Sequence, residues 1–104
     1  MSIVHVIEDN FQKEIESSNL VLVDFFANWC GPCKMLSPVL ESVASKKTDL
    51  KILKVNVDEC ESLARKYGVM SIPTLILFKE GNLISSQIGF MGEDDLISWI
   101  DGTK

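Results

Sequence analysis

The amino-acid sequence predicts an α/β domain with a central β-sheet. Three observations predict this class. Apolar runs of strand length alternate along the chain with apolar residues at helical spacing. A nearly continuous apolar run covers residues 20–27, and two shorter runs near the carboxyl end flank a turn signal. The resulting order, βαβαβαββα, indicates a sheet that is parallel in its first part and antiparallel at its final hairpin.

The first two predicted elements are a short strand and a helix. Residues 3–6 have the apolar character of a strand. Asp9 and Gln12 stand three residues apart, the spacing of a capping box, and predict the start of a helix. We expect Phe11 and Ile15 on the inner face of that helix.

The next strand and helix surround a cysteine pair. Residues 20–27 form an apolar run typical of a strand that is buried on both faces. Pro38 lies inside the helix that follows, where it should kink the helix rather than end it, because the apolar pattern continues. That pattern consists of Met35, Leu36, Val39, Leu40, Val43 and Ala44.

The third predicted strand covers residues 52–57, and a short helix follows it. We expect Asp58 to cap this helix, with Glu61 at the reciprocal position of a capping box. Gly68, which comes directly after Tyr67, provides the signal that ends it.

A hairpin and a helix complete the chain. Residues 74–78 and 83–88 are strands on either side of a turn at 79–82, which contains a glycine. The last helix is predicted over 93–100. Its first turn carries three acidic residues, where the helix dipole favours them, and Gly102 lies just past its end.

Length and charge exclude several classes of function. A chain of 104 residues suits a single domain over 1–104, and we expect a monomer. Ten basic against 15 acidic residues give a net charge of −5, without the basic patch that nucleic-acid or anionic-membrane binding requires. The chain shows no signal peptide and no apolar run long enough to span a bilayer. Its three cysteines do not suggest a secreted disulfide framework, so we expect a cytoplasmic protein.

Cys30 and Cys33 form a CxxC pair within NWCGPCK, residues 28–34. A zinc site needs four ligands, and the chain adds only Cys60 and His5, neither in a second cluster, so we expect no bound metal. A structural disulfide across so short a loop would stabilise the fold little. Two buried thiols are disfavoured because Cys30 should lie at an exposed junction of strand and helix. A redox-active pair is the favoured interpretation.

The start of a helix suits this chemistry. Its free N–H groups and the positive end of its dipole stabilise a thiolate, which is the attacking species in disulfide exchange. Cys30 is therefore the expected nucleophile. Cys33, one turn further along, is close enough to attack the mixed disulfide that Cys30 forms. Pro32 is tolerated in the first helical turn and stiffens the loop.

Over essentially its whole length the sequence resembles the thioredoxin family. The strongest evidence is WCGPC after a buried strand, followed at the expected distance by IPT. The segments that carry the resemblance are VDFFANWCGPCK at 23–34, KVNVD at 54–58, YGV at 67–69, IPT at 72–74 and Gly89.

The resemblance implies a thioredoxin fold, a mixed five-stranded sheet flanked by four helices. It implies a general protein-disulfide reductase that has no bound cofactor and is recycled by a thioredoxin reductase. Cys30 would attack and Cys33 would resolve, and the Gly31-Pro32 pair between them is the reducing variant of the motif.

Two further residues gain a role from the resemblance. Asp24 interrupts the strand at 20–27, and burial there would raise the pKa of its carboxyl toward that of a useful proton acceptor. From the residues alone, a purely structural aspartate is equally favoured. The family places a buried aspartate beneath the second cysteine, where it deprotonates Cys33, and a lysine near it, here Lys54, that modulates its proton affinity.

The resemblance also implies a docking surface for substrate proteins. The Ile72–Pro73 peptide bond would be cis and would face the cysteines, so that the backbone of Ile72 could pair with an extended substrate segment. A flat apolar patch would surround it, which suits partly unfolded proteins better than a small molecule. Its residues would be Trp29, Gly31, Pro32, Ile72, Pro73, Gly89 and Phe90.

Some positions depart from the family pattern. Phe26 stands where many members carry a second tryptophan, and Met70 and Ser71 replace an arginine and a glycine that are common before the proline loop. These positions bear on the choice of partner and reductase. Cys60 is expected to be a non-catalytic thiol, because it lies between two glutamates.

Two other functions stay open beside the general reductase. One is a dedicated electron carrier for a single partner enzyme. The other is a thioredoxin-like binding subunit whose thiols are incidental, which is disfavoured because Cys30, Cys33, Asp24 and Pro73 occur together.

Overall fold

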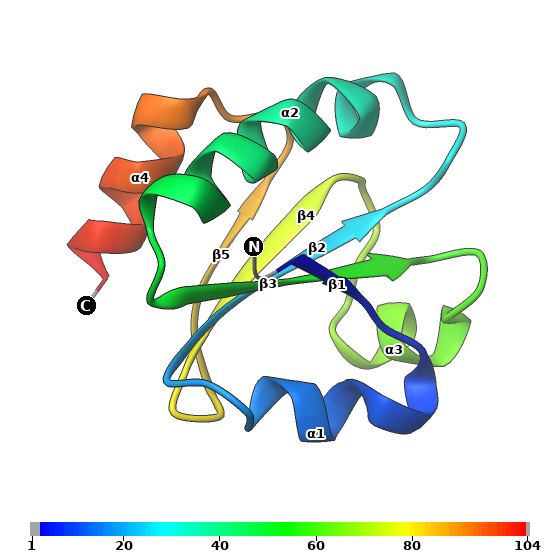
Figure 1. Cartoon of the computed structure of the whole chain (residues 1–104). Coiled ribbons are helices and arrows are strands. Elements are labelled where there is room, and N and C mark those ends of the chain that lie inside the picture. The colour runs from blue at the N-terminus through cyan, green and yellow to red at the C-terminus, as the bar shows by residue number, and fades with distance from the viewer. Residues whose placement is uncertain (1–2, 104) are drawn as a thin grey trace.

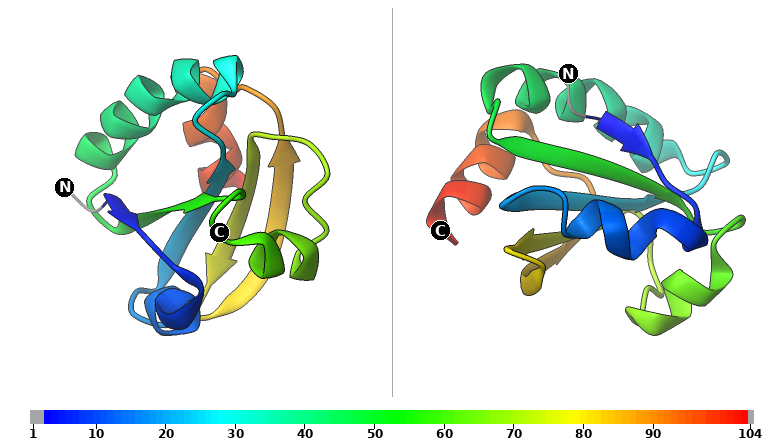
Figure 2. Two further views of the ribbon diagram at one scale, coloured as in Figure 1. Left: turned by 90° about the vertical axis from the view of Figure 1, so that its right-hand side faces the viewer. Right: turned by 60° about the horizontal axis from the view of Figure 1, so that its bottom comes forward.

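The computed structural model describes residues 3–103 and shows a mixed five-stranded sheet between two layers of helices (Figures 1 and 2). The strand order across the sheet is β1-β3-β2-β4-β5. This arrangement confirms the predicted fold class and element order. The strands are β1 (Ile3–His5), β2 (Leu20–Phe26), β3 (Leu50–Asn56), β4 (Thr74–Lys79) and β5 (Asn82–Ile88). The helices are α1 (Phe11–Ile15), α2 (Gly31–Lys46), α3 (Glu61–Lys66) and α4 (Glu93–Gly102), with a 3-10 turn, η1 (Glu8–Asn10), before α1.

The sheet changes direction at β4. β3 runs parallel to both β1 and β2, whereas β4 is antiparallel to β2 and to β5. The hairpin between β4 and β5 turns at Glu80 and Gly81, both of which have positive φ, the geometry that favours glycine. The central position of β2 explains its sequence, because a strand with neighbours on both sides and helices on both faces is buried along most of its length; Phe26, at its end, is partly buried.

Side chains of the strands alternate between two cores, one on each face of the sheet. On one face Val21, Val23 and Phe25 of β2 pack with Phe11 and Ile15 of α1 and with α3. On the other face Leu20 and Leu22 pack against the buried stripes of α2 and α4. Asp24 follows this alternation and therefore lies on the face that α2 covers.

The predicted capping box at the first helix does not form. The chain instead enters η1 at Glu8, and the side chain of Asn10 accepts a hydrogen bond from the backbone N–H of Ile7 at 3.0 Å. Gln12 donates to Glu16 one turn further along, rather than back toward Asp9. Phe11 and Ile15 are buried, as predicted.

The predicted cap of α3 is also wrong. The helix begins at Glu61 with Cys60 at the capping position, and Asp58 lies outside it. The acceptor for the first turn comes from a distant part of the chain. The carboxylate of Glu8 accepts from the backbone N–H of Ser62 at 2.9 Å and of Leu63 at 3.4 Å.

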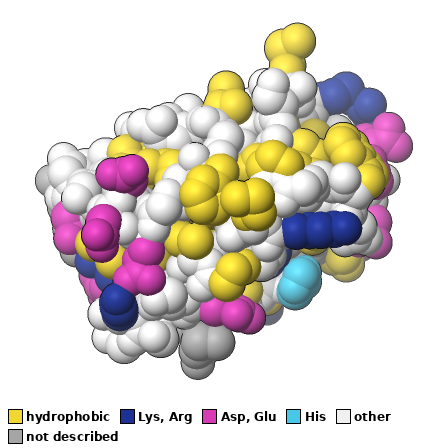
Figure 3. All heavy atoms as spheres, turned by 90° about the horizontal axis from the view of Figure 1, so that it is seen from above, with side chains coloured by type: hydrophobic (Ala, Val, Ile, Leu, Met, Phe, Trp, Pro, Cys, Tyr) yellow, Lys and Arg dark blue, Asp and Glu magenta, His cyan; other side chains and the backbone are white. Residues whose placement is uncertain are grey.

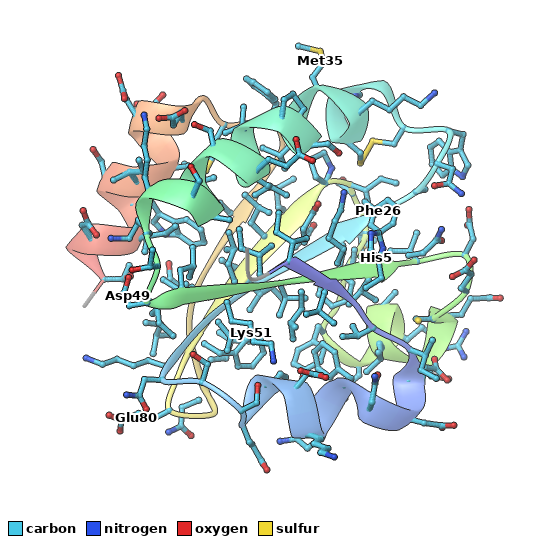
Figure 4. The ribbon with its side chains drawn as sticks, viewed as in Figure 1. His5, Phe26, Met35, Asp49, Lys51 and Glu80 are labelled. Atoms are coloured by element: carbon cyan, nitrogen blue, oxygen red, sulfur yellow. A yellow bond between two sulfur atoms is a disulfide. The ribbon has the colours of Figure 1, made fainter. Side chains whose placement is uncertain are left out.

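In α2 the prediction for Pro38 agrees with the structure in that the helix continues, whereas the prediction for Met35 is wrong. Pro38 lies inside α2, which continues past it to Lys46. Met35 is 61 % exposed and lies outside the apolar stripe in which the spacing placed it; its side chain points away from the sheet (Figure 4). Within residues 3–103, none of the helices has the length and apolar character that crossing a bilayer demands.

Candidate functional site

The site begins where the chain leaves the carboxyl end of β2 and enters α2. A turn joins the two, with the backbone N–H of Cys30 donating to the carbonyl oxygen of Ala27 at 3.2 Å. Cys30 caps α2 and is joined to Cys33 in a disulfide whose Cα atoms lie 5.2 Å apart. The backbone N–H of Cys33 also donates to Cys30 Sγ at 3.2 Å. The α2 N-terminus therefore directs a donor at the first sulfur atom.

The two sulfur atoms are less accessible than the sequence suggests. Cys30 is only 4 % exposed and Cys33 only 3 %. The expectation of an exposed junction holds for the residues beside the cysteines, because Trp29, Gly31 and Pro32 are exposed. A reacting partner therefore has to approach through the narrow surface that these neighbours form.

The loop before β4 closes the site from the other side. The Ile72–Pro73 peptide bond is cis, as the resemblance implies, and the carbonyl oxygen of Ile72 lies 3.8 Å from Cys30 Sγ. Gly89 follows β5 and donates from its N–H to the carbonyl oxygen of Pro73 at 2.8 Å. Its φ of +97° is a conformation that residues with side chains rarely adopt. The loop and the end of β5 are thus held together beside the disulfide.

Exposed apolar side chains occur near this end of the molecule. Trp29 is 70 % exposed, and its indole N–H donates to the carboxylate of Asp58 at 2.9 Å. Phe90, after β5, is 44 % exposed, and Met70, two residues before Ile72, is 95 % exposed. Viewed from the α2 side, hydrophobic side chains gather in a band across the surface (Figure 3). Such a surface favours contact with another protein.

Asp24 lies beneath the disulfide-bearing helix in an unusual environment. Its side chain is fully buried, and neither carboxylate oxygen has a hydrogen-bond partner among the described residues. Burial raises the pKa of Asp24 to about 6, while the nearby Lys54 opposes this rise. A carboxyl of this kind changes its protonation state near neutral pH.

Lys54 is the register partner of Asp24 on the neighbouring strand β3. Its ammonium nitrogen lies 3.9 Å from Asp24 Oδ2 and donates to the hydroxyl of Ser37 at 3.2 Å. The same nitrogen lies 4.6 Å from the centre of the Phe26 ring. The Ser37 hydroxyl in turn donates to the carbonyl oxygen of Cys33 at 3.4 Å. Backbone and side-chain contacts thus link the second cysteine to the buried carboxylate.

A cavity of about 230 Å³ opens beside this link and is lined by Cys33, Lys34, Ser37, Lys54 and neighbouring residues. His5 and Phe26 also line it, and their rings meet edge to face at 6.1 Å (Figure 4). The cavity is smaller than those that enclose drug-sized ligands. A larger hollow of about 400 Å³ includes Asp49 and Lys51, at the opposite end of the sheet from Phe26 (Figure 4).

Cys60 is separate from this site. It belongs to the core on the α1 and α3 face and is 1 % exposed, with its sulfur 3.8 Å from the carbonyl oxygen of Val6. Burial raises the pKa of its thiol, and the carboxylates of Glu8 and Glu59 raise it further. A buried thiol with a raised pKa is a poor nucleophile.

Reasoning from sequence missed two residues of the site. Asp58 satisfies a helix-cap motif in the sequence, but its carboxylate accepts a hydrogen bond from the indole N–H of Trp29. Ser37 was not singled out, although its position four residues after Cys33 puts both on one face of α2, a signal that could have found it.

Comparisons with known proteins agree on one family. The family model for Thioredoxin matches residues 2–102. A thioredoxin from Chlamydia trachomatis serovar D is 50 % identical over 95 residues, covering 91 % of this chain and 92 % of the relative. One from Staphylococcus epidermidis is 50 % identical over 104 residues, covering 97 % of each chain. The structure of a mutant thioredoxin from Halobacterium salinarum NRC-1 superposes with a TM-score of 0.92 at 37 % identity, covering 98 % of this chain and 90 % of that one.

Proposed function

The chain belongs to the thioredoxin family, and from this membership we propose that it is a general protein-disulfide reductase with Cys30 as nucleophile and Cys33 as resolving thiol. Its relatives are thiol–disulfide oxidoreductases, and a cysteine pair able to form a disulfide fits that activity. The observation that carries the proposal is the Cys30–Cys33 disulfide at the start of α2, beside the cis-proline loop.

In the first step the reduced protein attacks a substrate disulfide. The Cys30 thiolate, stabilised by the α2 N-terminus and the N–H of Cys33, attacks one sulfur of the substrate. A mixed disulfide forms between Cys30 and that sulfur. The substrate's second sulfur leaves as a thiolate and takes up a proton.

In the second step Cys33 releases the product. Asp24 accepts the proton of the Cys33 thiol, and its raised pKa of about 6 suits a proton acceptor that works near neutral pH. The Cys33 thiolate attacks Cys30 Sγ and breaks the mixed disulfide. The first substrate sulfur leaves as a thiolate and is protonated, and two electrons have passed from the protein to its substrate.

The substrate segment docks in an extended conformation across the cis-proline loop. The backbone of Ile72 pairs with it, as in strand addition, next to the sulfur of Cys30. Trp29, Gly31, Pro32, Gly89 and Phe90 provide the surrounding surface, whereas Pro73, which the resemblance also assigns to it, is buried. Backbone pairing and an apolar surface place few demands on the sequence of the partner, which suits a general reductase.

Family membership implies protein disulfides as substrates and a thioredoxin reductase that recycles the chain. We propose that one domain over 1–104 acts as a cytoplasmic monomer and holds no cofactor or metal of its own. Its net charge of −5 argues against nucleic acid and anionic membranes as partners.

Reduction of insulin disulfides by dithiothreitol, with and without the protein, tests this function. We expect rapid turnover by the wild type and none by Cys30→Ser. Cys33→Ser should instead accumulate as a mixed disulfide with its substrate through Cys30, visible on a non-reducing gel. If the folded, fully reduced wild type gives no turnover, the proposal is wrong. If Cys33→Ser releases substrate normally, the two thiol roles are wrong.

A dedicated electron carrier is the second candidate function. The exposure of Met70, directly beside the substrate loop, favours it, because an apolar side chain stands there in place of the charged residue common in the family. Capture of partners by Cys33→Ser distinguishes the two functions. One dominant mixed disulfide would indicate a dedicated carrier, and many would indicate a general reductase.

A further inference from the structure

Lys54 and Asp24 carry opposite charges, yet they do not form a direct hydrogen bond. The ammonium nitrogen of Lys54 lies 3.9 Å from Asp24 Oδ2, about 1 Å longer than a charge-assisted hydrogen bond. Both carboxylate oxygens of Asp24 are without a hydrogen-bond partner in the described structure. A buried carboxylate gains from a direct donor, so something must hold the ammonium back.

The contacts of Lys54 identify Ser37 as the residue that holds it. The Lys54 ammonium donates to Ser37 Oγ at 3.2 Å. The hydroxyl has a partner of its own, because it donates to the carbonyl oxygen of Cys33 in the preceding turn of α2 through a long hydrogen bond of 3.4 Å. With its proton used in that bond, the hydroxyl oxygen presents lone pairs to the ammonium. The Phe26 ring, 4.6 Å from the same nitrogen, gives the cation a second support.

We propose that Ser37 is a positioning residue whose hydroxyl holds the Lys54 ammonium just beyond hydrogen-bond distance of Asp24. This inference rests on the proposed function, in which Asp24 takes the proton of Cys33. A direct ion pair would favour the charged carboxylate and make it a weaker base. By keeping the pair apart, Ser37 keeps Asp24 able to accept a proton near neutral pH.

Few other groups near Asp24 could influence the protonation of its carboxyl. Lys54 comes from β3, and Cys33, Lys34 and Ser37 come from α2; all four line one cavity with His5 of β1. On its other side Asp24 pairs with the apolar Leu75 of β4. Among residues 3–103, Lys54 is the charged group that acts on the Asp24 carboxyl, so its distance should control the titration of Asp24.

Titration of the Asp24 carboxyl carbon by NMR in the oxidised protein tests the proposal. In Ser37→Ala the ammonium loses its hydroxyl acceptor and can close on Asp24. Shortening the gap from 3.9 Å to about 3 Å at an effective dielectric constant of about 20 should lower the Asp24 titration midpoint by about one pH unit. Alanine favours a helix, so the variant should fold. An unchanged or raised midpoint would overturn the proposal.

Three further variants sharpen the test. Ser45→Ala removes a hydroxyl that also donates to a carbonyl of α2, that of Ser42, and should leave the midpoint unchanged. Ser37→Thr keeps the hydroxyl and should restore the wild-type midpoint. In a Lys54→Met background, Ser37→Ala should have no effect, because the cation it releases is gone. A shift that persists there would show a merely structural effect and contradict the proposal.

The titration needs no substrate, so it separates this inference from the function on which it rests. The pH profile of insulin reduction by Ser37→Ala should move to lower pH by the same amount as the midpoint. If Asp24→Asn leaves that profile unchanged while Ser37→Ala still lowers the midpoint, the positioning by Ser37 stands and the catalytic role of Asp24 fails. If the profile depends on Asp24 but Ser37→Ala does not move the midpoint, the positioning fails.

Discussion

Asp24 holds a carboxyl group at a fully buried position, without a hydrogen-bond partner among the described residues. Such a group destabilises the folded state whenever it is charged, because burial in a low-dielectric environment favours its neutral form. A residue chosen only for stability would be apolar here, like Leu22 on the same face of β2. Its environment therefore favours function over packing as the reason for an aspartate at this position.

The pH dependence of stability should reveal the destabilisation that the charged form of Asp24 causes. Folding raises the pKa of Asp24 from 3.8 to about 6, so between these values the folded state binds more protons than the unfolded state. The contribution of Asp24 to the free energy of unfolding therefore falls as pH rises from about 4 to about 6. With about 1.4 kcal/mol for each pH unit of difference, the contribution of Asp24 is a loss of about 3 kcal/mol, complete near neutral pH.

Asp24→Asn should remove this loss, because an amide does not titrate. Urea unfolding at pH 4 and pH 7 measures it, and the comparison within each protein cancels any change of packing in the variant. We expect the pH 4 to pH 7 difference to become more favourable by about 2.4 kcal/mol in the variant, because a small part of the loss is already present at pH 4. Equal pH dependence in both proteins would mean that Asp24 titrates as an ordinary aspartate.

Among the secondary-structure elements, α3 illustrates how distant segments complete a short helix. It has six residues, too few to be stable alone, and its first N–H groups are satisfied by Glu8, which lies 54 residues before Ser62. The same carboxylate lies near enough to Cys60 to raise the pKa of that thiol. One side chain at the start of η1 thus ties that turn to α3.

Glu8→Ala should destabilise the protein by about 1 kcal/mol, the usual cost of losing a helix cap. Asp9→Ala is the matched control, since Asp9 is the adjacent acid in the same turn and makes no bond to the α3 backbone in the described structure. Urea unfolding of both variants measures the difference. Equal losses would assign the effect to the charge of the turn and not to the cap.

The element order was predictable because apolar periodicity is a local property. Apolar runs and helical spacing, together with turn and helix-end signals, located all five strands and four helices, with ends displaced by a few residues, as at Leu50 and Gly102. The caps were not predictable. Asp9 and Asp58 each satisfied a local motif. At the first helix the neighbouring Asn10 makes the capping bond instead, and for Asp58 the deciding groups, Glu8 and Trp29, lie far away in the sequence.

The residues of the candidate site also divide into those that the sequence predicts and those that it does not. Cys30 and Cys33 could be proposed from spacing alone, since both belong to one short motif before a helix. The closeness of Ile72 to Cys30 came only from family resemblance, because nothing near residue 72 indicates what the fold brings beside it. The contact between Ser37 and Lys54 could be known only from the structure, since it depends on how α2 lies across β3.

At the scale of the whole molecule, one sheet separates two cores but also joins them. β2 contributes alternate side chains to both, so neither core can be lost while the other keeps its strand. The shape is compact, with a radius of gyration of 12.3 Å, close to the value of about 13 Å for a domain of this length. Both features favour one cooperative unit.

We therefore expect a single unfolding transition. The calorimetric enthalpy should equal the van't Hoff enthalpy, at about 70 kcal/mol near 60 °C for a chain of this length. Circular dichroism and tryptophan fluorescence should give the same midpoint, because Trp29 beside the disulfide and Trp99 on α4 sample different parts of one domain. Two separated transitions would contradict the single domain.

Cys30 and Cys33 both lie at the start of α2, and this has a consequence for how partners recognise the protein. The disulfide closes a loop of four residues and joins no distant segments, so we expect the sheet and both cores to keep one outline whether the bond is open or closed. The oxidised and the reduced protein should then present nearly the same surface to a partner. A partner that binds only the reduced or only the oxidised form has to distinguish the two within the small surface of Trp29, Cys30 and Ile72.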